Sequence, residues 1–162
     1  GLDYYRTEPD LHSAQQHSFR RHIELAKEFG KALVIHDRDS HEDVLAVLES
    51  CGAPERTVFH CFSGDADMAA YCADRGYYMS FAGPITYKAN DELRAALAVV
   101  PDDLLLVETD APYLTPVPHR GKANASYLMP YTVRFMAEQR GMDEAAMCTL
   151  LYGNTQRAFG EW

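Results

Sequence analysis

Two histidines and one aspartate each stand at the end of a short apolar run. His36 ends ALVIH, His60 ends TVFH, and Asp110 comes shortly after LLLV. If these runs are parallel strands of one sheet, their carboxyl ends meet at one edge, which is where α/β folds build their sites. Imidazole together with carboxylate oxygen suits Zn, Mn, Fe or Ni. The spacing therefore predicts a metal site formed by His36, His60 and Asp110.

Glu108 lies two residues before Asp110, on the same side of the chain if the segment is extended. Removing an ionised carboxylate from water costs free energy unless a cation or hydrogen-bond donors interact with it. Two carboxylates after a buried run therefore need a cation nearby. Three roles are open for Glu108. It is a further metal ligand, a support that orients a ligand, or an ion-pair partner of Arg38 or Lys122.

The loop PVPHRGKAN is basic within an acidic chain. It brings together His119, Arg120 and Lys122, and Gly121 lets a ligand approach the backbone closely. Arginine offers a planar fork of donors and lysine a compact charge, and both suit a phosphate. The loop is therefore a candidate phosphate-binding segment, with an ordinary basic surface turn as the alternative.

Arg38 is a further candidate for the same anion. It follows His36 by two residues in the segment IHDRD. The alternative is an ion pair with Asp37 or Asp39, which flank it in the sequence.

Two further groups of rings are the aromatic side chains near the apolar runs and the remaining histidines. Aromatic side chains near the ends of the apolar runs could stack on bases, and core packing explains them equally well: Tyr4, Tyr5, Phe62, Phe81 and Tyr113. The histidines outside the candidate site are expected to be solvated: His12, His17, His22 and His41.

The elements that would position these residues alternate in type. Helical spacing of apolar residues predicts helices over 12–30, 41–52, 65–76, 90–100, 131–139 and 143–153, with Gly30 and Gly52 ending the first two and Asn90 capping the fourth. Short apolar runs predict strands over 32–36, 57–62, 77–83 and 104–107. Strands alternating with helices indicate an α/β fold with a parallel sheet, in a single domain over 1–162.

Composition narrows the class of protein. The chain has 162 residues, 47% hydrophobic and 24% charged, which is usual for a globular domain. Four cysteines without a C-x-x-C pair indicate reduced thiols, and no apolar run is long enough to span a membrane, so a cytoplasmic protein is expected. The net charge of −9 argues against broad electrostatic adhesion to nucleic acid or membrane.

Several motifs taken together resemble one family. GLDYYR, VIHDRD, FHCFSGD, SFAGPITYK, LLLVETDAPYLTPVPHRGK and GNTQRAF, in that order, look like the TatD family of metal-dependent deoxyribonucleases. The resemblance implies a TIM-barrel (β/α)8 metal-dependent hydrolase that cleaves phosphodiester bonds of DNA, often as a 3′ to 5′ exonuclease on single strands or 3′ ends. It also implies divalent metal ions (Mg, Mn or Zn, two in the complete barrel) held by His36, His60 and Asp110.

Within such an arrangement we expect further roles for individual residues. Asp110 would ligate metal and accept a proton from the attacking water, with Glu108 supporting the ligands. Arg38, His119, Arg120 and Lys122 would anchor the substrate phosphate.

The chain departs from the family pattern in two places. Asp37 and Ser40 stand where family members commonly have Ser and Ala. The family's H-x-H pair and a Glu precede the segment that matches GLDYY, whereas this sequence starts at Gly1. The expectation is therefore the second half of a barrel, with four βα units and exposed strand edges that favour self-association or pairing with the missing amino-terminal half.

Two other functions stay open. One is a related barrel enzyme that acts on a small ester, amide or phosphotriester. The other is an inactive half-barrel that serves as a structural or interaction module.

Overall fold

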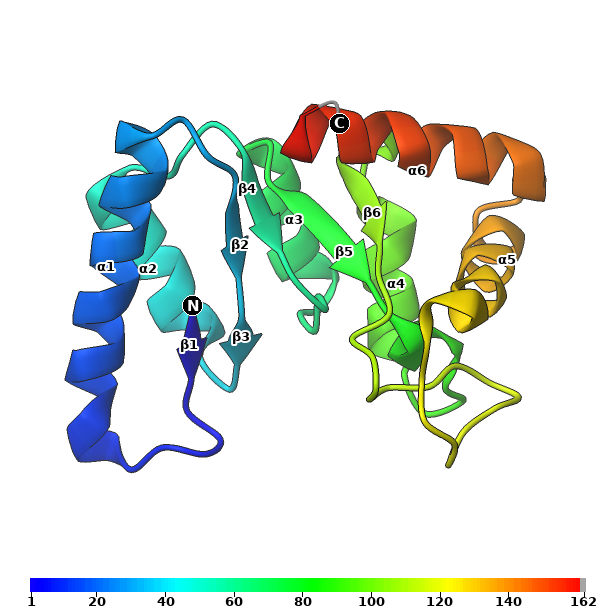
Figure 1. The fold of residues 1–162 in the computed structure, drawn as a ribbon, viewed down its shortest axis with the longest axis horizontal. Helices are drawn as coiled ribbons and strands as arrows, with labels where there is room; N and C mark the ends of the chain where they lie inside the picture. Colours follow the sequence, from blue (N-terminus) through cyan, green and yellow to red (C-terminus); the bar gives the residue numbers. More distant parts are fainter. Residues whose placement is uncertain (161–162) are drawn as a thin grey trace.

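Strands and helices alternate along the chain in the computed structural model, which describes residues 1–160 (Figure 1). The strands are β1 (Leu2–Asp3), β2 (Leu33–Ile35), β3 (Asp37–Arg38), β4 (Thr57–Phe59), β5 (Tyr78–Phe81) and β6 (Leu105–Val107). The α-helices are α1 (His12–Glu28), α2 (His41–Cys51), α3 (Ala66–Asp74), α4 (Asp91–Val99), α5 (Met129–Gln139) and α6 (Glu144–Phe159). Short 3-10 helices lie between them: η1 (Pro9–Leu11), η2 (Gly83–Thr86), η3 (Asp102–Leu104) and η4 (Ser126–Leu128).

The sheet is parallel, as the alternation of elements predicts. β2, β4, β5 and β6 are hydrogen-bonded in that order, and β1 pairs with β3. Only His36 separates β2 from β3, and its carbonyl accepts the Leu2 N–H at 2.8 Å, so β1 extends the same parallel arrangement on the outer side. The predicted strands are confirmed, and β1 is an addition, because a strand of two residues has no periodicity to detect.

Alternation along the strands separates two faces. One face carries Ile35, Phe59 and Met79, which pack with apolar residues of all six α-helices into the main core. The other face carries Val58, Tyr78 and Leu106, which form a small second cluster with Ala158 of α6. His36, His60 and Glu108 each lie two residues after a second-face residue of β2, β4 or β6, namely Val34, Val58 and Leu106. Strand alternation therefore directs their side chains to the second face as well.

Local sequence explains where several helices begin and end. The carboxylates of Asp65 and Asp143 each accept a backbone N–H three residues on, which caps α3 and α6. Gly30 and Gly52 follow α1 and α2 with positive φ values of 57° and 69°, as predicted for helix ends. Asn90 precedes α4, but its side chain donates to a carbonyl of η2 instead of capping the helix, so that part of the prediction is wrong.

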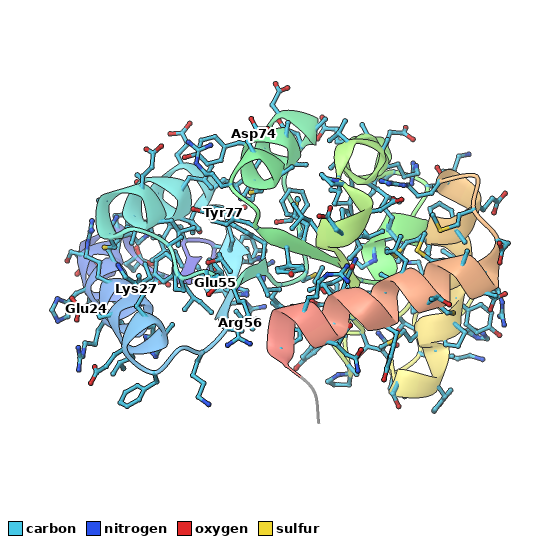
Figure 2. All side chains as sticks on the ribbon, turned by 90° about the horizontal axis from the view of Figure 1, so that it is seen from above. Glu24, Lys27, Glu55, Arg56, Asp74 and Tyr77 are labelled. Carbon is cyan, nitrogen blue, oxygen red and sulfur yellow. The ribbon has the colours of Figure 1, made fainter. Side chains whose placement is uncertain are left out.

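The two ends of the sheet differ in what covers them. Figure 2 looks onto the amino ends of the strands, where Glu55 and Arg56 precede β4 and Tyr77 precedes β5, and α6 crosses this end. The carboxyl ends point the other way, toward the loops drawn at the bottom of Figure 1. Across residues 1–160, none of the helices combines the length and apolar character that crossing a membrane requires.

Candidate metal centre

The candidate site is formed where β2, β4 and β6 end. The strand register pairs Ile35 with Phe59, so the residues that follow them, His36 and His60, leave the sheet side by side. Their ring centroids are 6.2 Å apart, with the rings tilted by 35°. The two predicted histidines thus lie near each other at the carboxyl edge of the sheet, but His36 is not part of the group of close ligand atoms, which is formed by His60, Glu108 and Asp110.

His60 is the centre of the cluster. Its Nδ1 donates to Glu108 Oε1 at 2.6 Å, and its Nε2 lies 3.6 Å from Asp110 Oδ1. The side chains of His60, Glu108 and Asp110 are 28%, 20% and 33% exposed, so solvent still reaches them. Each offers one ligand atom, and these atoms lie within 4.8 Å of one another.

Unusual backbone conformations occur directly after the strands that carry the site. Asp39 after β3, Cys61 after β4 and Asp110 after β6 have φ values of 54°, 46° and 55°. Non-glycine residues adopt this left-handed region at a cost and cluster at functional sites. The chain is therefore not extended at Asp110, and a turn, not strand alternation, brings its carboxylate back toward His60.

His36 lies beside the cluster and contacts a different carboxylate. Its Nε2 is 3.0 Å from Asp3 Oδ2, and its side chain is 52% exposed. Burial opposes ionisation of Asp3, but hydrogen bonds from His36 and from the Arg6 and Tyr5 backbone lower its pKa. Sequence reasoning missed Asp3, although the available signal was the one used for Asp110: a carboxylate that follows apolar Leu2 in the quoted motif GLDYYR.

The pKa values show how the site balances its charge. The hydrogen bond to Glu108 raises the pKa of His60, against the opposing effect of burial, and the charges of Glu108 and Asp110 act in the same direction. Burial, followed by the same two carboxylates, raises the pKa of the Cys61 thiol to about 12. The carboxylates therefore favour the imidazolium form of His60, and Cys61 is a neutral thiol when no metal is bound.

The donor set fits a divalent cation. Imidazole nitrogen suits Zn or Mn, and carboxylate oxygen suits Zn, Mn or Mg; the group found within residues 1–160 contains no cysteine. A histidine that ligates metal commonly donates its other ring N–H to a carboxylate, which fixes the ring. Glu108 makes this contact with His60 Nδ1, which leaves Nε2 facing Asp110.

The predicted phosphate-binding residues divide into two groups. The guanidinium of Arg120 lies 4.0 Å from the ring centroid of Tyr87, and Lys122 is exposed. His119 instead packs edge-on against Tyr131, with its Nε2 buried and without a hydrogen-bond partner among residues 1–160. Arg120 and Lys122 are therefore accessible to a ligand, whereas the ring of His119 points toward the interior of the protein.

Arg38 is also accessible. The alternative to phosphate binding, an ion pair with Asp37 or Asp39, is wrong. Its guanidinium lies 3.8 Å from the ring centroid of Tyr5. The ion pairs formed within residues 1–160 include neither Arg38, Arg120 nor Lys122. The three candidate anchors are thus cations without a carboxylate partner in the described part of the chain.

Two histidines that were expected to be solvated make specific contacts. His41 Nδ1 donates to the buried carboxylate of Asp37 at 2.7 Å, and this hydrogen bond raises the pKa of His41. His12 stacks on Tyr4 with ring centroids 3.6 Å apart. The expectation holds for His17 and His22, whose side chains are exposed, and fails for the other two, which are only partly exposed.

A parallel βα arrangement with imidazole and carboxylate side chains at the carboxyl ends of its strands is typical of the TIM-barrel class. Residues 1–160 match the family model described as "TatD related DNase". The chain belongs to the TatD family.

Similar proteins agree with this assignment. The chain is 49% identical over 148 residues to "Uncharacterized metal-dependent hydrolase TatD" of Mycobacterium tuberculosis, covering 90% of this chain and 55% of that protein. It is 40% identical over 164 residues to "Uncharacterized metal-dependent hydrolase YcfH" of Escherichia coli K12, covering 98% of this chain and 60% of that protein. The crystal structure of the TatD homologue YjjV of Escherichia coli superposes with a TM-score of 0.92 at 28% identity, covering 100% of this chain and 62% of that one.

These matches correct one prediction about the extent of the fold. The family match extends over 1–160, so the view that the chain is only the carboxyl-terminal half of a barrel is not supported. That view rested on the family's H-x-H pair and Glu, which precede the segment matching GLDYY, and on a count of four strands, which omitted β1. The chain spans between 55% and 62% of the length of the relatives named above.

Proposed function

We propose that this protein hydrolyses phosphodiester bonds of DNA with the help of a divalent cation. The observation that carries the proposal is the contact of His60 with both Glu108 and Asp110 at the carboxyl edge of a parallel sheet. Family membership supports the hydrolase class, and the loop that contains Arg120 and Lys122 supports a phosphate-bearing substrate.

The carboxylates and imidazoles have distinct roles in this proposal. His60 Nε2 and Asp110 would hold the cation, and His36 on the neighbouring strand would be a further ligand. When bound, a divalent cation polarises a phosphoryl oxygen and lowers the pKa of a water molecule. Glu108 keeps the proton of His60 on Nδ1, so that Nε2 presents its lone pair. Asp110 accepts the proton of the attacking water through a carboxylate oxygen.

The cationic side chains would hold the strand. Arg38 lies on the β1 side of the site and Arg120 and Lys122 on the β6 side, and none of them is neutralised by a carboxylate within residues 1–160. A planar guanidinium can contact two phosphate oxygens at once. Attack on single strands from a 3′ end is the finer form of the proposal, and it follows from the family resemblance.

The test is degradation of a labelled single-stranded oligonucleotide with Mg²⁺, Mn²⁺ or Zn²⁺ and with a chelator. Asp110→Asn and His60→Ala should each lower turnover by at least about 100-fold, since loss of an outer support alone costs about 10- to 100-fold. Asp103→Asn is the matched control, because Asp103 is exposed in η3 at the opposite end of β6. The control should retain full activity.

Other outcomes would contradict the proposal. Degradation that survives both the chelator and Asp110→Asn would remove the metal centre from the reaction. Hydrolysis of small esters, amides or phosphotriesters without DNA cleavage would favour the related barrel enzyme. Absence of any turnover would favour an interaction module.

A further inference from the structure

A groove of about 530 Å³ opens in the loop that follows Asp110. Its walls include Tyr87, Tyr113, Arg120 and Lys122. Small-molecule sites commonly have volumes of about 300–1,000 Å³, so the groove can hold a ligand of nucleotide size. An aromatic ring and two cations on its walls match the base and the phosphate of a nucleotide.

Tyr113 is held at a fixed place relative to the candidate metal centre. Its backbone N–H donates to the Asp110 carbonyl at 2.9 Å, which closes a turn between the two residues. The buried side chain of Asn124 donates to the carbonyls of Thr109 and Tyr113, both at 2.7 Å. The ring of Tyr113 is nevertheless 70% exposed, so the backbone is fixed while the ring stays free to contact a ligand.

Its exposure separates Tyr113 from Phe62 and Phe81, two other aromatic residues near the strand ends. Phe62 and Phe81 are buried in the main core, which explains them without a ligand. Tyr113 has no such explanation, because most of its surface faces solvent beside the groove. The alternative offered by the sequence, core packing, therefore does not apply to it.

The cationic wall of the groove is also fixed from behind. The hydroxyl of Tyr87 donates to the Thr115 carbonyl at 3.0 Å, and the hydroxyl of Thr115 donates to the Lys122 carbonyl at 2.6 Å. Arg120 stacks on the ring of Tyr87. Stacking uses the face of the guanidinium and leaves its in-plane N–H groups available for a phosphate.

We propose that this groove binds one nucleotide of a single-stranded substrate beside the bond that is cleaved. The base stacks on Tyr113, and its phosphate contacts Arg120 and Lys122. This inference rests on the proposed function and adds to it a residue that selects unstacked bases. Stacking on an aromatic ring tolerates any base, so the groove discriminates single strands from duplex and not one sequence from another.

Equilibrium binding separates the two contacts. Fluorescence anisotropy would be measured at low salt and in the presence of chelator, with an intact single-stranded hexanucleotide and with a fully abasic strand of equal length. Tyr113→Ala should raise the Kd of the intact strand by about 5- to 150-fold, which corresponds to loss of one stacked base. It should leave the Kd of the abasic strand within twofold. Arg120→Ala should weaken both strands alike, because it removes a phosphate contact.

Two variants serve as matched controls. Tyr113→Phe retains the ring and should bind the intact strand within twofold of the parent protein. Tyr127→Ala removes a tyrosine that is 75% exposed in η4 and does not line the groove, so it should leave binding unchanged.

The outcomes distinguish this inference from the function on which it rests. If the parent protein degrades DNA and the Tyr113→Ala variant binds the intact strand as tightly as the parent does, the proposed role of the groove is wrong. The proposed function would not be affected. Equal weakening of intact and abasic strands by Tyr113→Ala would likewise overturn base stacking. A parent protein that neither binds nor degrades DNA would overturn both.

Discussion

Substitution of Glu108 distinguishes a metal ligand from a residue that supports one. Glu108 Oε1 accepts the Nδ1 proton of His60 at 2.6 Å, and both side chains are less than a third exposed. In the supporting role, Glu108→Ala frees the imidazole to rotate and to change tautomer. Glu108→Gln keeps a neutral acceptor for the same proton, so it should be the milder change.

The expected size follows from the kind of hydrogen bond. A hydrogen bond to a charged group contributes about 1.5–3 kcal/mol, which corresponds to about 10- to 150-fold in an equilibrium constant. This agrees with the loss of about 10- to 100-fold in metal affinity seen when such supports are removed. We therefore expect Glu108→Ala to weaken Zn²⁺ or Mn²⁺ binding by about 10- to 100-fold and Glu108→Gln by less.

Metal affinity is measured by competition with a chromophoric chelator, at fixed pH, for the parent and for each variant. Asp110→Asn provides the reference for loss of a direct ligand. If Glu108 itself binds the cation, Glu108→Gln should lose as much affinity as Glu108→Ala, and both should equal Asp110→Asn. That result would refute the supporting role.

The remaining predictions concern stability. The hydrogen bond to Asp37 raises the pKa of His41, so His41→Gln should lower the free energy of unfolding below about pH 6.5. The difference between the parent and the variant should disappear as the pH rises through the folded-state pKa of His41. Urea unfolding at acidic and at alkaline pH measures this difference. A difference that grows with pH would contradict it. A Cβ at Gly83 would lie 1.9 Å from the Leu114 carbonyl oxygen, so Gly83→Ala should destabilise by about 1–3 kcal/mol in the same assay. Gly153→Ala within α6 meets only ordinary contacts and should stabilise by up to about 1 kcal/mol.

Most of the fold was predictable because long apolar patterns encode it. The predicted helix over 12–30 is α1 at His12–Glu28, since Phe19 and Ile23 recur at helical spacing. β1 could not be found in this way. It forms through backbone hydrogen bonds to residues more than thirty positions away, such as that of Leu2 to His36, and these leave no local signal.

The candidate site was predictable where strand alternation controls it. Alternation turns His60 and Glu108 to the same face, and they meet. The approach of Asp110 depends on a left-handed backbone conformation, which no periodicity in the sequence reports. The direction of His119 depends on Tyr131, a contact between two segments, so the basic character of the loop could not show that this ring faces inward.

Charge explains why two different groups of side chains surround the site. Glu108 and Asp110 attract a cation but repel a phosphodiester, and the chain as a whole carries a net charge of −9. In the proposed function, attraction for a nucleic-acid strand would therefore come from the cation and from basic groups without a carboxylate partner in residues 1–160, such as Arg120 and Lys122. In that proposal the loop would hold one phosphate without metal, whereas a phosphate next to the carboxylates would become favourable only once a cation had neutralised them. Removal of metal should on this argument weaken binding of the strand without abolishing it, while it abolishes cleavage.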